Sequence, residues 1–153
     1  DFPVMVPTMI ENGSSIHDDE GIRFYRIDGN KAIRLTYTNG ANEYWGIQQT
    51  GWDEPPILSE PTLERTIGGR TYKLFFSGAK LHIVAFEQDG GVYWVVNTLQ
   101  NKLSNETMIA IAEAIPSVVS SARPQRRSML RNVIRIAGAS RWPRPSRSIS
   151  VGR

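Results

Sequence analysis

Alternation of apolar and polar positions dominates the first hundred residues of this chain and predicts a series of β-strands. The alternating runs cover residues 22–27, 31–38, 43–49, 63–67, 70–76, 81–86 and 92–97. Short segments rich in Gly, Asn, Asp and Ser separate most of these runs, as expected for tight turns between antiparallel strands. The run 92–97 is apolar on both faces, so we expect it to be a central strand with Trp94 in the core.

Strict alternation also predicts which side chains share a face of the sheet. In the run 81–86 it places Leu81, Ile83 and Ala85 on one face and His82 with Val84 on the other. His82 is therefore expected to be a half-exposed sheet residue.

Residues 50–61 break the series of strands with a loop that contains Trp52 and the pair Pro55-Pro56. Two consecutive prolines lack the N–H donors that a β-ladder needs. We expect this segment to be a fixed loop that crosses the sheet or its edge.

The hydrophobic period changes at Ser104 from that of a strand to that of a helix. The apolar positions that follow share a helical stripe: Met108, Ile109, Ile111, Ala112 and Ile115. Ser104 suits the N-cap, Glu106 suits the first turn, and Pro116 ends the helix. The chain is therefore predicted to form an α+β domain over residues 1–116, an antiparallel β-meander with one C-terminal helix packed across it.

Charge divides the chain where this helix ends. All fifteen acidic residues lie at or before Glu113, together with nine basic residues, so residues 1–113 carry a net charge of −6. The other nine basic residues are all arginines of the segment 117–153, which is rich in Arg, Ser and Pro. We interpret this segment as a basic tail with a short amphipathic helix near residues 128–137.

Three functions of the basic tail stay open. Arg127, Arg131 and Arg135 share one face of the expected helix and could contact phosphates or anionic lipid headgroups. The apolar face of that helix could instead dock on a membrane surface or a partner. The tail could also be an adventitious extension outside the native reading frame. Specific nucleic-acid recognition is not expected, because only Trp142 interleaves with the arginines.

The residue inventory argues against most catalytic and cofactor chemistry. The chain has no cysteine, which excludes disulfides, thiolate nucleophiles and zinc ribbons. Its glycine pairs lie between strands and not before a helix, so no phosphate loop or dinucleotide site is expected, and no cofactor. His17 precedes three acidic residues, a pattern that favours a solvated loop over a metal site. No apolar run is long enough to span a membrane.

Aromatic residues offer the one candidate ligand surface. Tyr44, Trp45 and Trp52 flank the proline loop, and with His82 they could line a shallow groove for a sugar ring, peptide or lipid chain. The alternative is that these aromatic side chains fasten the loop to the sheet.

Several short motifs stand out: E-Y-W-G-I-Q-Q-T at residues 43–50, G-G-R-T-Y at 68–72, Y-W-V-V-N-T-L at 93–99 and L-S-N-E-T-M-I-A-I-A at 103–112. Together they resemble an accessory domain of actinobacterial envelope proteins of the LytR-CpsA-Psr type. The resemblance covers residues 2–115. It implies an extracytoplasmic module that is tethered through a membrane helix upstream of Asp1.

LytR-CpsA-Psr enzymes transfer phosphate-linked glycopolymers to the cell wall, but their catalytic domain is not in this chain, so no catalytic residue is carried over. We therefore expect a non-enzymatic exported domain of the cell envelope that positions a partner or a wall polymer. The alternatives are an enzyme or regulatory subunit with the aromatic groove, and a nucleic-acid or membrane-surface binder that acts through the basic tail.

Overall fold

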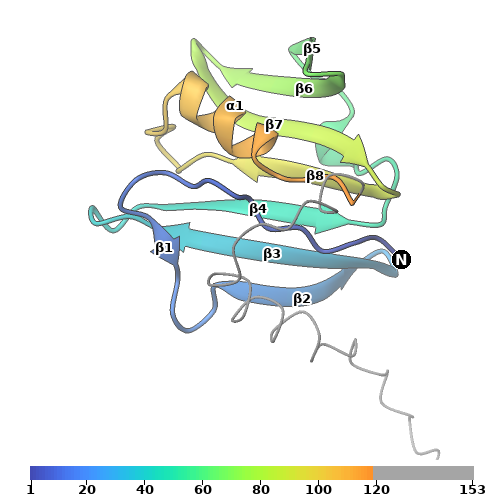
Figure 1. Cartoon of the computed structure of the whole chain (residues 1–153), viewed down its shortest axis with the longest axis horizontal. Helices are drawn as coiled ribbons and strands as arrows, with labels where there is room; N and C mark the ends of the chain where they lie inside the picture. The colour runs from blue at the N-terminus through green and yellow to red at the C-terminus, as the bar shows by residue number, and fades with distance from the viewer. Residues whose placement is uncertain (119–153) are drawn as a thin grey trace, which may run out of the picture. The chain divides into compact units, whose positions relative to one another are not determined.

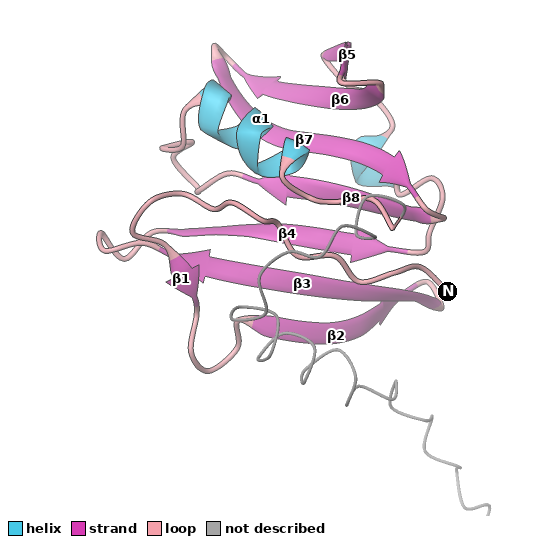
Figure 2. Ribbon diagram, viewed as in Figure 1, coloured by secondary structure: helices cyan, strands magenta, loops and turns pink. Residues whose placement is uncertain are grey.

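The computed structural model describes residues 1–118, in which one antiparallel sheet of eight strands carries a helix across one face (Figures 1 and 2). The strands are β1 (Ser15–Ile16), β2 (Ile22–Ile27), β3 (Asn30–Thr38), β4 (Tyr44–Thr50), β5 (Leu63–Ile67), β6 (Arg70–Ser77), β7 (Lys80–Gln88) and β8 (Gly91–Val96). A 3₁₀ turn, η1 (Pro56–Leu58), precedes β5, and the helix is α1 (Asn105–Glu113). The predicted α+β class and the packing of the helix are confirmed.

The basic tail falls beyond this description. The expected helix near residues 128–137, with Arg127, Arg131 and Arg135, lies outside the described residues. Its proposed contacts with anions or membranes stay predictions.

The sheet consists of two meanders joined side by side. Strands β2, β3 and β4 form the first meander, and β5, β6, β7 and β8 form the second. The junction is the antiparallel pairing of β4 with β8, from Gly46 opposite Val96 to Thr50 opposite Val92. Both β1 and β2 pair with β3, so they share one edge of the sheet, and β5 forms the other edge.

We call the face that carries α1 the first face. Its core joins side chains from both meanders to the helix: Ile33, Leu35, Tyr37, Trp45, Ile47, Tyr72, Leu74, Leu81, Val84, Phe86, Tyr93, Val95, Leu103, Met108, Ile111, Ala112 and Ile115. Helix α1 lies over β7 and β8, while the N-terminal segment crosses β3 and β4 (Figure 1). These two pieces together close the first face.

Helix α1 is fixed at both ends by side chains. The Ser104 hydroxyl accepts a hydrogen bond from the Thr107 N–H at 3.1 Å, which is the predicted N-cap. At the other end, Arg70 of β6 donates to the carbonyls of Ala112 at 3.3 Å and Ile115 at 3.0 Å. A cation at this end also opposes the negative pole of the helix dipole. The sheet therefore caps the helix that covers it.

The N-terminal segment is held by side chains of the sheet and by a backbone bond to the end of α1, and not by strand pairing. Gln49 is fully buried, and its amide accepts from the Met5 N–H at 2.8 Å and donates to the Met5 carbonyl at 2.6 Å. The Tyr93 hydroxyl donates to the Pro3 carbonyl at 2.7 Å, and the Thr8 N–H donates to the Ala114 carbonyl at 2.8 Å. These bonds satisfy backbone groups of a segment that has no strand partner of its own.

A β-bulge at His82 corrects the face assignment that strict alternation predicted for β7. The register against β6 shifts there, because Phe75 pairs with Ile83 whereas Phe76 pairs with Leu81. Leu81 therefore joins the first-face core, while Ile83 belongs to the cluster on the opposite face. One extra residue in a strand reverses the alternation on either side of it.

Asn97 organises the connection from β8 to α1. This side chain is 4% exposed; its amide nitrogen donates to the carbonyls of Leu81 and Leu103, and its oxygen accepts from the N–H groups of Thr98 and Leu103. Every hydrogen-bonding position of the amide group is thus used on backbone.

We predict that Asn97→Ala lowers the free energy of unfolding by about 2–4 kcal/mol, because several buried backbone groups lose their partners together. Urea unfolding followed by tryptophan fluorescence measures the change. Gln100 is an exposed residue of the same connection, and Gln100→Ala is the control, with an expected change below about 0.5 kcal/mol. Equal effects of the two substitutions would contradict the structural role of Asn97.

Tyr37 gives a second prediction, because its buried hydroxyl has no hydrogen-bond partner within residues 1–118. Burial raises the pKa of Tyr37 to about 12, above the value near 10 of an unfolded tyrosine. The folded state thus favours the neutral phenol, so stability is full below pH 10 and falls as the pH rises toward 12. Tyr37→Phe removes that alkaline loss and raises stability at pH 7 by up to about 1 kcal/mol.

The control for this prediction is Tyr93→Phe, which deletes the hydrogen bond to the Pro3 carbonyl and costs about 1 kcal/mol at pH 7. Urea unfolding at pH 7 distinguishes the two variants by sign, and a second series at pH 11 measures the alkaline loss, which both substitutions reduce because burial raises the pKa of Tyr93 as well. A loss of stability for Tyr37→Phe at pH 7 would show that its hydroxyl has a partner in solution.

Candidate functional site

The face of the sheet opposite α1, which we call the second face, is only partly covered. The proline loop crosses it after β4, as the sequence predicted, and Leu58 of η1 packs on a small apolar cluster. That cluster comprises Leu58, Ile83, Ala85, Val92 and Trp94, with Phe75 and Val96 partly buried beside it. The loop therefore covers part of the second meander, while β2, β3 and β4 keep polar side chains on this face.

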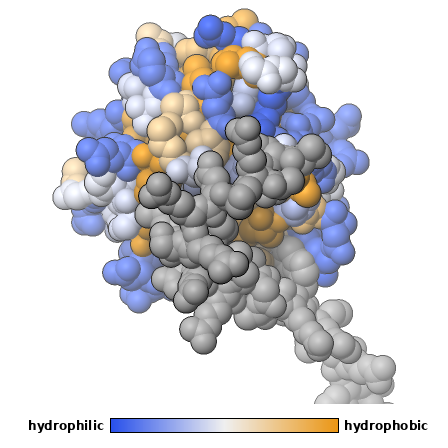
Figure 3. Space-filling model, in the orientation of Figure 1, coloured by the Kyte–Doolittle hydropathy of each residue, from blue (hydrophilic) through white to orange (hydrophobic). Residues whose placement is uncertain are grey.

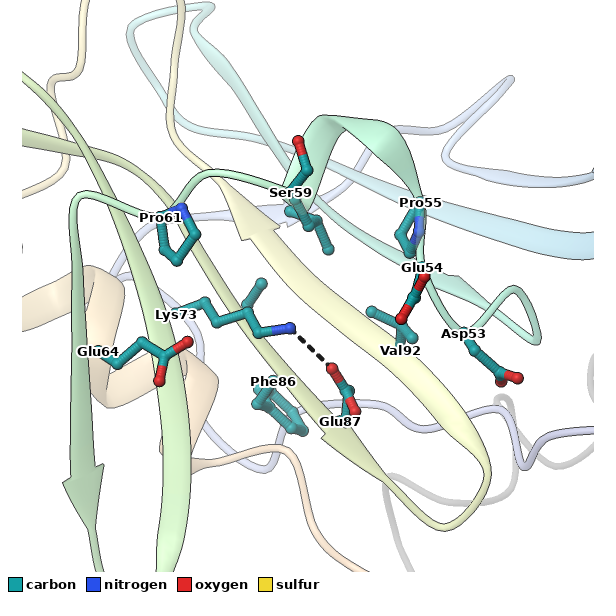
Figure 4. Close-up of a pocket in the computed structure, with 12 residues that line it drawn as sticks. Asp53, Glu54, Pro55, Ser59, Pro61, Glu64, Lys73, Phe86, Glu87 and Val92 are labelled. Atoms are coloured by element: carbon teal, nitrogen blue, oxygen red, sulfur yellow. Dashed lines mark hydrogen bonds and ion pairs between the residues drawn. The ribbon is translucent and has the colours of Figure 1, made fainter.

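A hollow of about 330 Å³ lies between the proline loop and strands β5 to β8 (Figure 4). Its lining residues are Asp53, Glu54, Pro55, Leu58, Ser59, Pro61, Glu64, Lys73, Ala85, Phe86, Glu87 and Val92. Apolar side chains form the floor, and carboxylates stand at the rim. We call this hollow the acid-rimmed pocket.

One ion pair already occupies the acid-rimmed pocket. Lys73 of β6 reaches toward β7, and its ammonium lies 2.8 Å from Oε1 of Glu87 (Figure 4). Glu54 directs its carboxylate into the same hollow from the loop, whereas Asp53 points away from it (Figure 4). Four carboxylates and one ammonium leave the lining with a net charge of −3. Such a pocket attracts a cation.

The other half of the second face is basic. Arg23 of β2 lies directly opposite Arg34 of β3 in the sheet register. Like charges in directly opposite positions are unfavourable. Arg23 pairs with Glu20, but Arg34 is exposed and makes no hydrogen bond or ion pair with another described residue. Arg34 is thus a cation without a local counter-charge.

Arg34 extends over a glycine on the neighbouring strand. A Cβ atom at Gly46 would lie 2.7 Å from the Leu35 carbonyl oxygen and 3.9 Å from Nε of Arg34. Gly46 therefore allows β3 and β4 to approach closely and leaves a shallow space beneath the arginine side chain.

Trp94 lies in the middle of the second face and has an unsatisfied donor. It is 2% exposed, and its indole Nε1 finds no acceptor among the described residues. Gln48 is its direct neighbour on β4 and donates its amide N–H to the Tyr25 hydroxyl. An indole N–H buried without a partner is costly. Trp94 packs with Leu58 in the buried cluster, so this donor is closed to other molecules.

The structure does not bring the four aromatic-groove candidates together. Trp45 is a first-face core residue, stacked on Tyr37 at 4.2 Å and donating from Nε1 to Ser14 at 3.0 Å. Tyr44 is 44% exposed and packs edge-on against His17 at 5.2 Å. Successive residues of a strand face opposite sides of a sheet, so these neighbours could not line one groove.

Trp52 and His82 also lie apart from the other candidates. Trp52 follows the end of β4, and Tyr44 begins it, which puts about 25 Å of extended chain between them. His82 lies at the β7 bulge, where its Nδ1 lies 2.9 Å from Oδ1 of Asn101. Neither pocket described within residues 1–118 is lined by Tyr44, Trp45, Trp52 or His82.

Metal-binding and membrane-spanning features are absent from the part of the chain that the structure describes. Residues 1–118 contain no group of three His, Asp or Glu side chains arranged to hold a metal ion. No helix in the same range is long and apolar enough to cross a membrane.

The sequence did not predict the acid-rimmed pocket, because the residues of the pocket come from four separate segments. Glu54, Glu64, Lys73 and Glu87 belong to the proline loop, β5, β6 and β7. The one available signal was the Pro55-Pro56 pair, which predicted a fixed loop over the sheet but not what lies beneath it.

Figure 3 shows the hydropathy of the side of the molecule that carries α1. Polar residues cover much of the visible surface of the described chain, and apolar residues gather in smaller groups between them (Figure 3).

No family model, no curated protein and no solved structure matches this chain. The geometry and charge of the second face are therefore the basis for assigning a function.

Proposed function

We propose that this chain is a non-enzymatic domain that positions a partner protein by holding a basic side chain of that partner in the acid-rimmed pocket. The observation that carries the proposal is the pocket itself, with its apolar floor and carboxylate rim.

The shape of the pocket suits arginine or lysine better than a small cation. Leu58, Ala85 and Val92 form a buried apolar floor, and Pro55 and Pro61 form its walls. Long basic side chains lay their methylene stems on apolar surface and keep the charged head in water. A rim of carboxylates above an apolar floor matches both parts of such a side chain.

Charge favours a protein partner over a phosphate-bearing wall polymer. Residues 1–113 carry a net charge of −6, which repels polyanions. The pocket concentrates that negative charge near the proline loop. A basic surface on another protein gains from the same field.

The buried polar side chains stabilise the fold and do not take part in the pocket. Four of them are hydrogen-bonded to backbone: Gln49, Thr50, Asn97 and Thr98. They satisfy strand and loop backbone and are not directed at the acid-rimmed pocket, whose lining contains none of them. Groups that are fixed in this way maintain the fold.

The cell envelope is the setting we propose, because the sequence motifs resemble an extracytoplasmic accessory domain. In intact cells that naturally make this protein, an added protease or a membrane-impermeant lysine reagent should reach it. A cytoplasmic protein in the same cells is the control. Protection of both proteins until the cells are lysed would contradict the envelope setting.

The pocket predicts binding of a short arginine peptide by the full chain. NMR titration with acetyl-Gly-Arg-Gly-amide should shift the amide signals of Ala85, Glu87 and Val92, and the glutamate analogue of the peptide should not shift them. Glu54→Gln and Glu64→Gln should each weaken binding by about threefold, because each removes one carboxylate from the rim.

Two further variants sharpen the titration. Glu60→Gln changes an exposed carboxylate of the same loop outside the pocket, so the affinity should not change. Lys73→Gln releases Glu87 from its ion pair, so the arginine peptide should bind about threefold more tightly. Shifts that spread over the first face, or equal effects of Glu54→Gln and Glu60→Gln, would contradict the proposal.

A further inference from the structure

We infer that the partner is a second copy of this chain, docked on the second face so that Arg34 of each copy enters the acid-rimmed pocket of the other. The inference rests on the proposed function and names the basic side chain that the pocket receives. It also assigns the occupant of the uncovered half of the sheet.

Charge makes the second face complementary to itself. Its β2–β3 half carries Arg23 and Arg34, whereas the half near β5 to β7 carries the rim of the acid-rimmed pocket. A two-fold axis that runs parallel to the strands places the same patch of both copies in contact and sets each basic half against an acidic half.

The sheet register specifies where Arg34 would lie. One row of side chains crosses the second face through Arg34, Gln48, Trp94 and Ala85 on β3, β4, β8 and β7. A two-fold axis parallel to the strands, between β4 and β8, exchanges β3 with β7. It leaves the position of each residue along the strand direction unchanged. Arg34 of one copy then lies opposite Ala85 of the other, which lines the pocket.

The proline loop determines the spacing between the two sheets. Because η1 stands on the second face, the facing sheet rests on it, and the side chain that reaches the pocket must be long. Ile57 of η1 is 59% exposed and offers apolar surface at this contact. Paired sheets pack about 10 Å apart when only side chains separate them, so a loop between them requires an arginine-length side chain.

Arg34 is the best candidate among the arginines of residues 1–118. Arg26 and Arg65 project from the first face, opposite Lys31 and Tyr72 in the register, and Arg70 caps α1. Arg23 shares the second face but already pairs with Glu20. Arg34 is therefore the one that gains a counter-charge on docking.

Sedimentation equilibrium of the full chain over about 5–500 μM tests the inference, because dimer formation follows mass action. We expect a monomer–dimer equilibrium. Arg34→Glu should weaken self-association by at least about tenfold. The new glutamate would face the carboxylates of the acid-rimmed pocket at both of the symmetric contacts in the dimer. Arg65→Glu is the matched control, with the same charge change on the same sheet but on the other face, and should leave the equilibrium unchanged.

A charge exchange tests the contact itself. Glu54→Lys should also be monomeric, because Arg34 then faces a lysine. A mixture of Arg34→Glu with Glu54→Lys should restore a heterodimer, since each copy supplies the charge that the other needs. Failure of the mixture to associate, or a wild-type chain that is monomeric throughout, would overturn the inference.

The outcomes separate this inference from the proposed function. A monomeric chain whose pocket still binds the arginine peptide keeps the partner-positioning function and rules out a second copy as the partner. A monomeric chain that binds no peptide removes both. A dimer that survives Arg34→Glu uses another surface and contradicts the inference alone.

Discussion

The pairing of β4 with β8 is the constraint on which the rest of the structure depends. It joins residues 46–50 to residues 92–96, which are far apart in the sequence, and turns two separate meanders into one sheet. Without it, each meander would be a small sheet with too little apolar surface for its own core. With it, one core runs beneath α1 and the N-terminal segment, and one continuous row of side chains crosses the second face from Arg34 to Ala85.

The two faces of this sheet differ in whether their polar groups have partners within the described residues. On the first face, Gln49, Tyr93 and Arg70 each bond to the backbone of a covering segment, so that the cover is fixed to the sheet. On the second face, Arg34 is exposed and has no such partner among the described residues. A protein surface with an unmatched cation and an acidic pocket is arranged for contact with another molecule. The proposed function and the docking of a second copy both follow from this asymmetry.

Local patterns in the sequence were enough to predict strands β2 to β8 and helix α1, but not the short strand β1 or the turn η1. The strand Leu63–Ile67 has the predicted bounds, and Ser104 caps the helix as expected, because alternation, turn residues and capping chemistry act over a few residues. The β4–β8 pairing was not predictable, since alternation describes a strand without naming its neighbour. The bulge at His82 was missed for a related reason: its cause is the register with β6, not the composition of β7.

The candidate site shows the same limit. Tyr44, Trp45 and Trp52 are close in sequence but do not form a groove. Neighbouring residues of a strand face opposite sides of the sheet, and the two ends of a strand lie far apart. The pocket is built instead from residues that only the folded sheet assembles. The most direct test of this account is an isotope-filtered NMR experiment on a mixture of labelled and unlabelled full chain. We expect contacts between copies from the Arg34 side chain to the methyl groups of Ala85 and Val92; contacts between copies confined to other residues, or none, would contradict this docking.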